Sequence, residues 1–161
     1  MWFNKKIFGD FMNTSKNLNV KLPKGWSDYT HEYKNGLRTF LRHDSKESGV
    51  IQISVVSYKN GEIPNPSCKD LVELAKKTGE NIPAGDVIET LSGNCTFGIY
   101  GTAIFKSEEF HRTQVWYLSD GYNFILATYI CTATPEAEEI SEAQDIINSI
   151  RIIKKPFWRL H

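Results

Sequence analysis

Phe97–Cys131 reads FGIYGTAIFKSEEFHRTQVWYLSDGYNFILATYIC. Three runs rich in strand-forming residues fill this segment, at 97–106, 110–118 and 122–131, and two short polar turns join them. Asp120-Gly121 separates the last two runs, and this dipeptide between alternating apolar runs is a strong hairpin signal because glycine accepts a positive φ. The segment therefore predicts a three-stranded antiparallel meander, which is stable only when other elements cover its apolar face.

The chain before this meander predicts further strands. Pro23 and Gly25 indicate a turn before a strand over 26–33, and Asn35-Gly36 is a hairpin signal that leads into a strand over 37–42. Val50–Tyr58 predicts a strand in which Ile51, Ile53 and Val55 share one face, with Gln52 and Ser54 on the other. Residues 86–91 predict a shorter strand, ended by Ser92-Gly93-Asn94.

Two helices are expected to cover the sheet. Ser67 and Asp70 have the spacing of a capping box, and the helix that they begin is expected to end at Gly79. The second helix is expected to begin with Thr134 as its cap and Pro135 at its first position. The acidic residues after Pro135 complement the positive end of that helix, and its apolar stripe consists of Ala137, Ile140, Ala143, Ile146, Ile147 and Ile150.

These elements predict an α+β fold, with a twisted, mostly antiparallel sheet of about six to seven strands flanked by helices. We expect a single domain over residues 1–161: an N-terminal aromatic segment at 1–17, a core at 18–153 and a basic aromatic tail at 154–161. Aromatic residues in 1–15 recur at spacings that suit one face of a short helix, which either docks on the core or contacts a partner or a membrane surface.

Composition narrows the class of protein. The formal net charge is zero, which disfavours a general nucleic-acid binder. No apolar run reaches the roughly 18 residues of a membrane span, and the N-terminus lacks the apolar core of a signal peptide. Three widely spaced cysteines indicate reduced thiols, so we expect a cytoplasmic protein. We also expect the protein to be either a monomer or a weak homodimer.

No pattern of catalytic, cofactor-binding or metal-binding residues stands out. Cys95 lacks any local signature of a nucleophile, although His43 or His111 can approach it in space. His31 and His43 flank the predicted hairpin but do not have the count or spacing of a metal site. Gly98 and Gly101 lie inside a strand pattern, so they indicate a bulge or room for a bulky neighbour such as Trp116 rather than a phosphate loop.

The order of elements resembles that of the PsbP-like superfamily. Leu22-Pro23-x-Gly25-Trp26 opens the first strand, and the closing helix ends with Ile147-x-Ser149-Ile150-Arg151. The resemblance covers roughly Leu18 to Ile153 and implies an α/β/α sandwich in a bacterial protein of uncharacterised function. It further implies a scaffold that mostly binds other proteins, as a photosystem subunit, a GTPase-binding factor or an effector chaperone, without a common catalytic set.

The leading hypothesis is therefore a non-enzymatic protein-binding domain, an adaptor, effector chaperone or immunity-type protein, that acts through a sheet edge or through its aromatic ends. The candidate partner-binding residues at the ends are Trp2, Phe3, Phe8, Phe157, Trp158 and Arg159. A second hypothesis is a small-molecule or enzymatic pocket between the meander and a helix, lined by Tyr100, Tyr117 and Tyr129. A third is attachment to a membrane surface through the basic aromatic ends.

Overall fold

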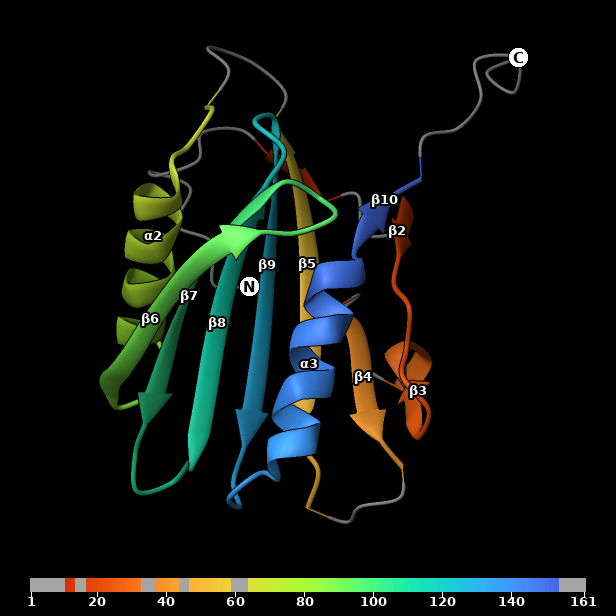
Figure 1. The fold of residues 1–161 in the computed structure, drawn as a ribbon, viewed down its shortest axis with the longest axis vertical. Helices are drawn as coiled ribbons and strands as arrows, with labels where there is room; N and C mark the ends of the chain where they lie inside the picture. Colours follow the sequence, from red (N-terminus) through yellow and green to blue (C-terminus); the bar gives the residue numbers. More distant parts are fainter. Residues whose placement is uncertain (1–10, 14–16, 33–36, 44–46, 59–63, 154–161) are drawn as a thin grey trace.

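An antiparallel sheet forms the centre of the structure, with helices packed on both of its faces (Figure 1). The computed structural model describes residues 11–13, 17–32, 37–43, 47–58 and 64–153. In sheet order, the strands are β3 (Trp26–Asp28), β4 (Arg38–Arg42), β5 (Val50–Tyr58), β9 (Asn123–Cys131), β8 (Arg112–Ser119), β7 (Ile99–Lys106) and β6 (Asp86–Asn94). Within the described residues an eighth strand, β1 (Phe11–Asn13), pairs with the end of β5.

The predicted meander is confirmed. β7, β8 and β9 pair antiparallel in an unbroken register, from Ile99 opposite Ser119 to Arg112 opposite Cys131. Gly121 has a φ of 101° in the turn between β8 and β9, a conformation that glycine adopts without a steric penalty. β9 continues the sheet by pairing with β5 over eight residue pairs, so the meander joins directly to the N-terminal half of the chain.

Alternate residues of the strands build a separate core on each face of the sheet. Under α3 (Ala137–Ser149), the core contains Ile51, Ile53 and Val55 of β5, as their alternation predicts. Under α2 (Cys68–Glu80), the core contains Leu71 and Ala75 of the helix and the following sheet residues: Ala103, Phe105, Val115, Tyr117, Phe124 and Leu126. The architecture is therefore the expected α/β/α sandwich, stabilised by two apolar layers.

The capping box of α2 is confirmed. Asp70 donates its backbone N–H to Ser67 Oγ at 3.1 Å, and Ser67 donates its own N–H to Asp70 Oδ2 at 2.9 Å. The expected end of this helix at Gly79 is wrong, because α2 continues to Glu80 and Gly79 packs against Phe105. A Cβ at position 79 would lie 2.0 Å from the Phe105 ring.

α2 also approaches the sheet closely at Gly101 of β7. A Cβ at this position would lie 2.4 Å from the backbone nitrogen of Val72 and 2.7 Å from the carbonyl carbon of Leu71. The backbone of α2 thus leaves no room for a side chain at Gly101. The expectation that Gly101 makes room for Trp116 is wrong. Trp116 lies in the core on the opposite face, under α3.

The predicted start of the second helix is also wrong, by two residues. α3 begins after Glu136, which occupies the N-cap position without a side-chain hydrogen bond. Thr134 does not cap the helix, and its hydroxyl instead forms a 3.1 Å hydrogen bond with His111 Nδ1. The buried stripe of α3 includes Ala143, Ile146 and Ile147 as predicted, but Ala137 is exposed.

Three strand boundaries differ from the predictions. Residues 11–13 form a strand rather than part of a helix, since their backbone pairs with the end of β5. The strand from Trp26 ends at Asp28, where Asp28 Oδ1 accepts from the Thr30 N–H at 2.8 Å and the chain turns into the short 3₁₀ helix η2 (Thr30–Glu32). β6 extends to Asn94, three residues beyond the predicted strand.

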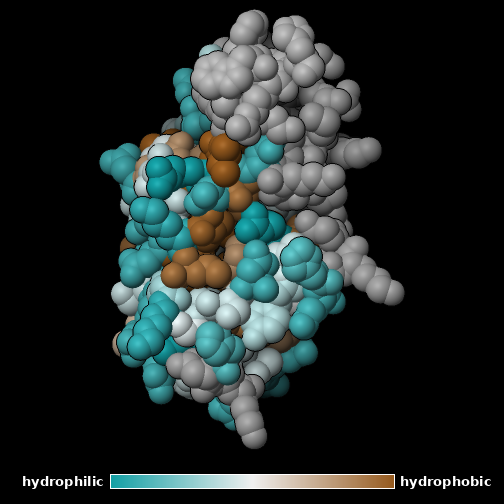
Figure 2. Space-filling model, turned by 90° about the vertical axis from the view of Figure 1, so that its right-hand side faces the viewer, coloured by the Kyte–Doolittle hydropathy of each residue, from teal (hydrophilic) through white to brown (hydrophobic). Residues whose placement is uncertain are grey.

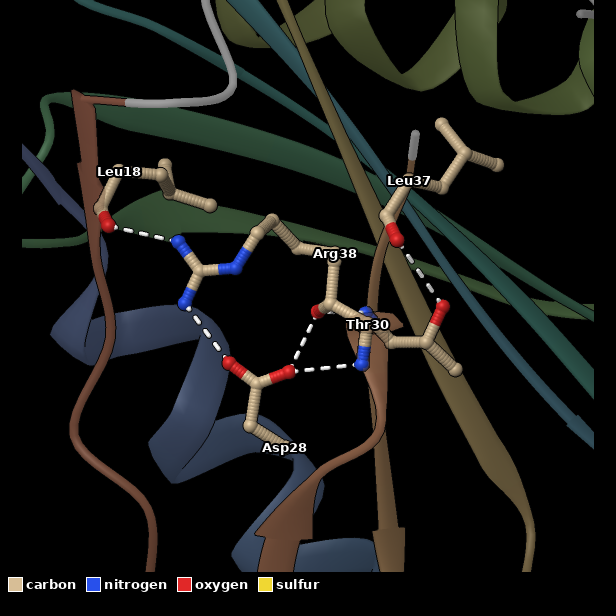
Figure 3. A network of polar contacts seen from close by, with 6 residues as sticks. Leu18, Asp28, Thr30, Leu37 and Arg38 are labelled. Atoms are coloured by element: carbon tan, nitrogen blue, oxygen red, sulfur yellow. Dashed lines mark hydrogen bonds and ion pairs between the residues drawn. The ribbon is translucent and has the colours of Figure 1, made fainter. Parts of the chain in front are cut away.

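Asp28 belongs to a polar network that ties the N-terminal strands together (Figure 3). Arg38 donates to Asp28 Oδ2 at 3.2 Å and to the Leu18 carbonyl at 2.8 Å, and the Thr30 hydroxyl also bonds to Asp28. Leu18 belongs to β2 (Leu18–Asn19), which forms a second, two-stranded sheet with β10 (Arg151–Ile152). The network therefore links this small sheet to β3 and β4.

Candidate binding sites at the β6 edge and the α3 pocket

β6 is the outermost strand of the sheet at the end opposite β3, and it pairs only with β7 within the described residues (Figure 1). Most of its nine residues are exposed. Three large apolar side chains contribute to this exposure: Val87 at 41%, Ile88 at 58% and Leu91 at 46%. We call the outward side of this strand the β6 edge.

The β6 edge has few of the features that prevent strands from pairing with other chains. Natural edge strands are kept short or carry lysine, proline or a bulge. β6 contains neither lysine nor proline, and its irregularity lies near its start, between Val87 and Glu89. From Glu89 to Asn94 the register with β7 is regular, so this part of the strand presents a regular row of outward-facing backbone groups.

Behind β6, a chain of polar side chains crosses β7 and β8. Arg112 donates to Gln114 Oε1 at 2.9 Å, Gln114 donates to Thr102 Oγ1 at 3.1 Å, and Thr102 donates to the Val115 carbonyl at 2.7 Å. Burial lowers the pKa of Arg112, and the nearby Glu89 carboxylate on β6 acts in the opposite direction. The hydrogen bonds therefore connect β7 and β8 beneath β6.

A pocket of about 280 Å³ lies beside the N-terminal end of α3, and we call it the α3 pocket. The described residues that line it are Arg42, Glu47, Ala133, Thr134, Pro135, Glu136 and Glu139. They come from the end of β4, the segment before β5, the connection from β9 into α3 and the first turn of α3. The wall is thus polar, with three carboxylates and one guanidinium.

Glu139 is the buried charge of the α3 pocket, with 4% of its surface exposed. Its Oε1 accepts from the Gly49 N–H at 2.8 Å, from the Tyr129 hydroxyl at 3.0 Å and from Ser48 Oγ at 3.2 Å. Burial, and then the charge of Glu139, raise the pKa of Tyr129 well above its ordinary value, so the phenol remains a donor. Glu139 therefore clamps the start of β5 to β9 and α3.

One turn further along α3, Glu142 makes a second polar contact with the sheet. Its Oε2 accepts from Trp26 Nε1 at 2.6 Å and lies 3.4 Å from Arg42 Nε. The sequence interpretation missed both carboxylates, because it assigned Glu139 only to the helix dipole. The available signal was their spacing: Glu139 and Glu142 are three residues apart, on the same face as the apolar stripe.

The candidate partner-binding residues at the two ends of the chain lie outside the described residues. They are Trp2, Phe3, Phe8, Phe157, Trp158 and Arg159. Their role in partner binding stays a prediction. Apolar side chains do gather on the side of the molecule that carries β2 and β10 (Figure 2). There Val20, Leu22 and Ile152 pack against the core under α3, so this patch is the rim of that core.

Cys95 and His111 do not form the arrangement that a nucleophilic site requires. Thr96, next to Cys95, donates its N–H to Asn148 at the end of α3, whereas His111 bonds to Thr134 before the start of that helix. At 1.5 Å per residue, the 13-residue helix separates the two by roughly 20 Å. Burial also raises the pKa of Cys95, which disfavours the reactive thiolate.

The remaining candidates also have structural partners. His43 Nδ1 forms a 3.0 Å hydrogen bond with Ser27 Oγ, and both His31 and His43 are exposed. Tyr117 and Tyr129 point to opposite faces of the sheet, where Tyr117 bonds to Thr78 at 2.7 Å under α2 and Tyr129 bonds to Glu139 under α3. A shared cavity lined by Tyr100, Tyr117 and Tyr129 is therefore wrong, and the α3 pocket lies elsewhere.

Solved structures resemble this fold at low sequence identity. The solution structure of cyanobacterial PsbP (CyanoP) from Synechocystis sp. PCC 6803 matches with a TM-score of 0.52 and 11% identity, over 89% of this chain and 92% of that one. The fold is PsbP-like. A crystal structure of a protein from Bacteroides thetaiotaomicron VPI-5482 matches with a TM-score of 0.53 and 16% identity, over 92% of this chain and 50% of that one.

The PsbP-like resemblance rests on the arrangement of elements rather than on site residues. At 11% and 16% identity, the two matches establish the fold alone. This chain spans half the length of the Bacteroides protein. No protein-family model matches the sequence, and no curated protein matches it. Within the described part of the chain, no helix has the length and apolar character that crossing a bilayer requires.

Proposed function

We propose that this PsbP-like domain is a non-enzymatic protein-binding module, of the adaptor, effector-chaperone or immunity type, whose partner adds an extended segment to the β6 edge. The observation that carries the proposal is the exposure of a long edge strand with apolar side chains at 41 to 58%. Strand addition gains affinity from backbone hydrogen bonds and specificity from alternate side chains, and β6 offers both.

The charge of β6 indicates the chemistry of the partner segment. The strand carries Asp86 and Glu89 and no basic residue. An extended segment with lysine or arginine between apolar residues complements it, whereas an acidic segment is repelled. We therefore propose that the partner segment combines lysine or arginine with apolar residues.

The test is affinity capture of the tagged full-length protein from the cells that naturally produce it, followed by measurement of Kd with the purified partner. Lysine at an exposed edge position blocks strand addition at little cost to the fold. Ile88→Lys and Leu91→Lys are each expected to weaken partner binding at least tenfold. Tyr122→Lys is the matched control, because Tyr122 is also an exposed apolar residue, at 57%, and lies in the β8–β9 turn.

A chain trimmed to residues 17–155 separates this proposal from binding through the aromatic ends. The trimmed chain is expected to retain the partner if β6 carries the contact. Loss of the partner on trimming, together with full binding by Leu91→Lys, would instead assign the contact to the ends. Turnover of an ester, phosphate or thioester substrate by the purified protein would contradict the non-enzymatic assignment.

A further inference from the structure

The small β2–β10 sheet brings together two segments of sequence that are both strongly basic. Residues 16–24 read KNLNVKLPK and residues 151–159 read RIIKKPFWR. Together they contain seven lysine or arginine residues and no aspartate or glutamate, although the formal net charge of the whole chain is zero. Because β2 and β10 pair antiparallel, basic residues from opposite ends of the chain gather in one place.

Three of these basic residues belong to the described part of the chain, and all three are exposed: Lys21, Lys24 and Arg151. None of them forms an ion pair with another described residue. The strands that carry them are fixed in place, because Arg151 pairs with Asn19 and the Lys21 N–H donates to Ser149 Oγ at 3.0 Å. The structure thus holds unpaired cations on one solvent-facing surface.

The carboxylates around this surface do not balance its charge. Asp28 lies 3.2 Å from Arg38 Nη2, and Glu142 Oε2 lies 3.4 Å from Arg42 Nε, so both are already compensated. Asp145 is an exposed carboxylate of α3, and it supplies one negative charge against three exposed cations. The surface is therefore positive overall and attracts anionic partners.

Exposed apolar surface accompanies the cations. Ile153 is 54% exposed, while Ile152 before it packs against the core under α3. Figure 2 shows an apolar band on this side of the molecule, bordered by hydrophilic side chains. The sequence then continues with Phe157 and Trp158, which lie outside the described residues. Apolar and aromatic residues mixed with lysine and arginine are typical of segments that lie in the interface of an anionic bilayer.

We infer that the surface formed by Lys21, Lys24, Arg151 and Ile153 binds the face of an anionic lipid bilayer. The cations attract the lipid phosphates, and the apolar side chain enters the boundary between head groups and acyl chains. A nucleic acid or an acidic protein would use the cations but would leave Ile153 without a role. This surface is separate from the β6 edge, and its test does not depend on the function proposed there.

Sedimentation of the full-length protein with lipid vesicles tests the inference. The protein is expected to bind vesicles of mixed phosphatidylglycerol and phosphatidylcholine at low salt, to be released as salt is added, and not to bind phosphatidylcholine alone. Each basic residue near an anionic surface raises affinity about fivefold, so the double variant Lys21→Glu and Arg151→Glu is expected to bind at least tenfold more weakly. Ile153→Ser is expected to weaken binding severalfold. Lys69→Glu with Lys77→Glu is the matched control, because both residues are exposed on α2.

A second readout uses the unaltered protein and does not depend on the stability of the variants. When nanodiscs that contain phosphatidylglycerol are added, the NMR signals of the Arg151 and Ile153 amides are expected to broaden before those of α2. The inference is overturned if the protein does not sediment with anionic vesicles at low salt, if it binds phosphatidylcholine equally well, or if the two double variants bind alike. Equally tight binding to polyglutamate, undiminished in Ile153→Ser, would assign the surface to an acidic protein and would also overturn it.

Discussion

At the scale of single residues, several carboxylates hold elements of the fold together through hydrogen bonds. Asp28 joins β3, η2 and β4 through Thr30 and Arg38, while Asp70 completes the capping box of α2. Burial acts to raise the pKa of Asp28, but the hydrogen bonds from Thr30 and the charge of Arg38 together outweigh it and lower this pKa below its ordinary value of 3.8. Hydrogen bonds from Ser67 likewise lower the pKa of Asp70.

The lowered pKa of Asp28 predicts a pH dependence of stability. Around pH 3.8 the unfolded chain binds more protons at this residue than the folded chain, so the free energy of unfolding decreases as the pH falls. The contribution is complete above about pH 5 and is lost as the pH drops below the ordinary pKa. Asp28→Asn is expected to flatten the dependence of the unfolding free energy on pH between about 5 and 2.

Urea denaturation at several pH values measures this effect. Asp145→Asn is the control, because it removes the same charge from an exposed residue of α3. The slope for this control is expected to match that of the unaltered protein. Equal slopes for Asp28→Asn and the unaltered protein would show that Asp28 does not couple folding to protonation.

At the scale of elements, α2 and β7 are held in contact by the absence of a side chain at Gly101. The atoms nearest to a Cβ there belong to the backbone of α2, which cannot move without shifting the helix. At Gly93 of β6, by contrast, a Cβ would lie 3.2 Å from the ring of Tyr100, a side chain that can rotate away. Two glycines in neighbouring strands thus differ in what a methyl group would meet.

Gly101→Ala is therefore expected to destabilise the protein by about 2 kcal/mol, as overpacking against an immobile neighbour typically does. The lower entropy of the unfolded chain offsets only about 0.4 to 1 kcal/mol of this loss. Gly93→Ala is the matched control and is expected to leave stability unchanged or slightly increased. Denaturation midpoints in guanidinium chloride compare the two variants, and coincident midpoints would contradict close packing of α2 on β7.

At the scale of the whole molecule, the strands of the sheet differ in how far they are shielded from solvent. β5, β8 and β9 have neighbours on both edges and side chains in the two cores, whereas β6 pairs on one edge only within the described residues. Local opening free energies range from near zero at exposed elements to the global value in the core. The strand proposed to bind a partner is thus also the central sheet's most exposed long strand.

Hydrogen exchange followed by NMR is expected to show this gradient directly. Amides of β5, β8 and β9 should exchange most slowly, and amides of β6 should alternate between protected, where they bond to β7, and unprotected, where they face outward. Addition of the partner should protect the outward set. Uniform protection along β6 at micromolar protein concentration would instead indicate that two copies already pair through this edge.

Much of the fold follows from local chemistry. The alternation in Val50–Tyr58 and the Asp120-Gly121 turn predicted β5 and the meander, and the Ser67 and Asp70 pair predicted the start of α2. These signals are readable because each depends on residues close together in the chain. The element order also led to the PsbP-like fold that the structural matches support.

Tertiary contacts decided what remained. Thr134 bonds to His111 rather than capping α3, residues 11–13 pair with β5, and Glu139 enters the core because Gly49 and Tyr129 supply donors for it. Such partners lie ten to ninety residues apart in the chain, so no local pattern announces them. The sequence by itself determined which segments become strands and helices. Only folding determined which strand edge stays exposed and which carboxylate faces a pocket, because both depend on what packs beside them.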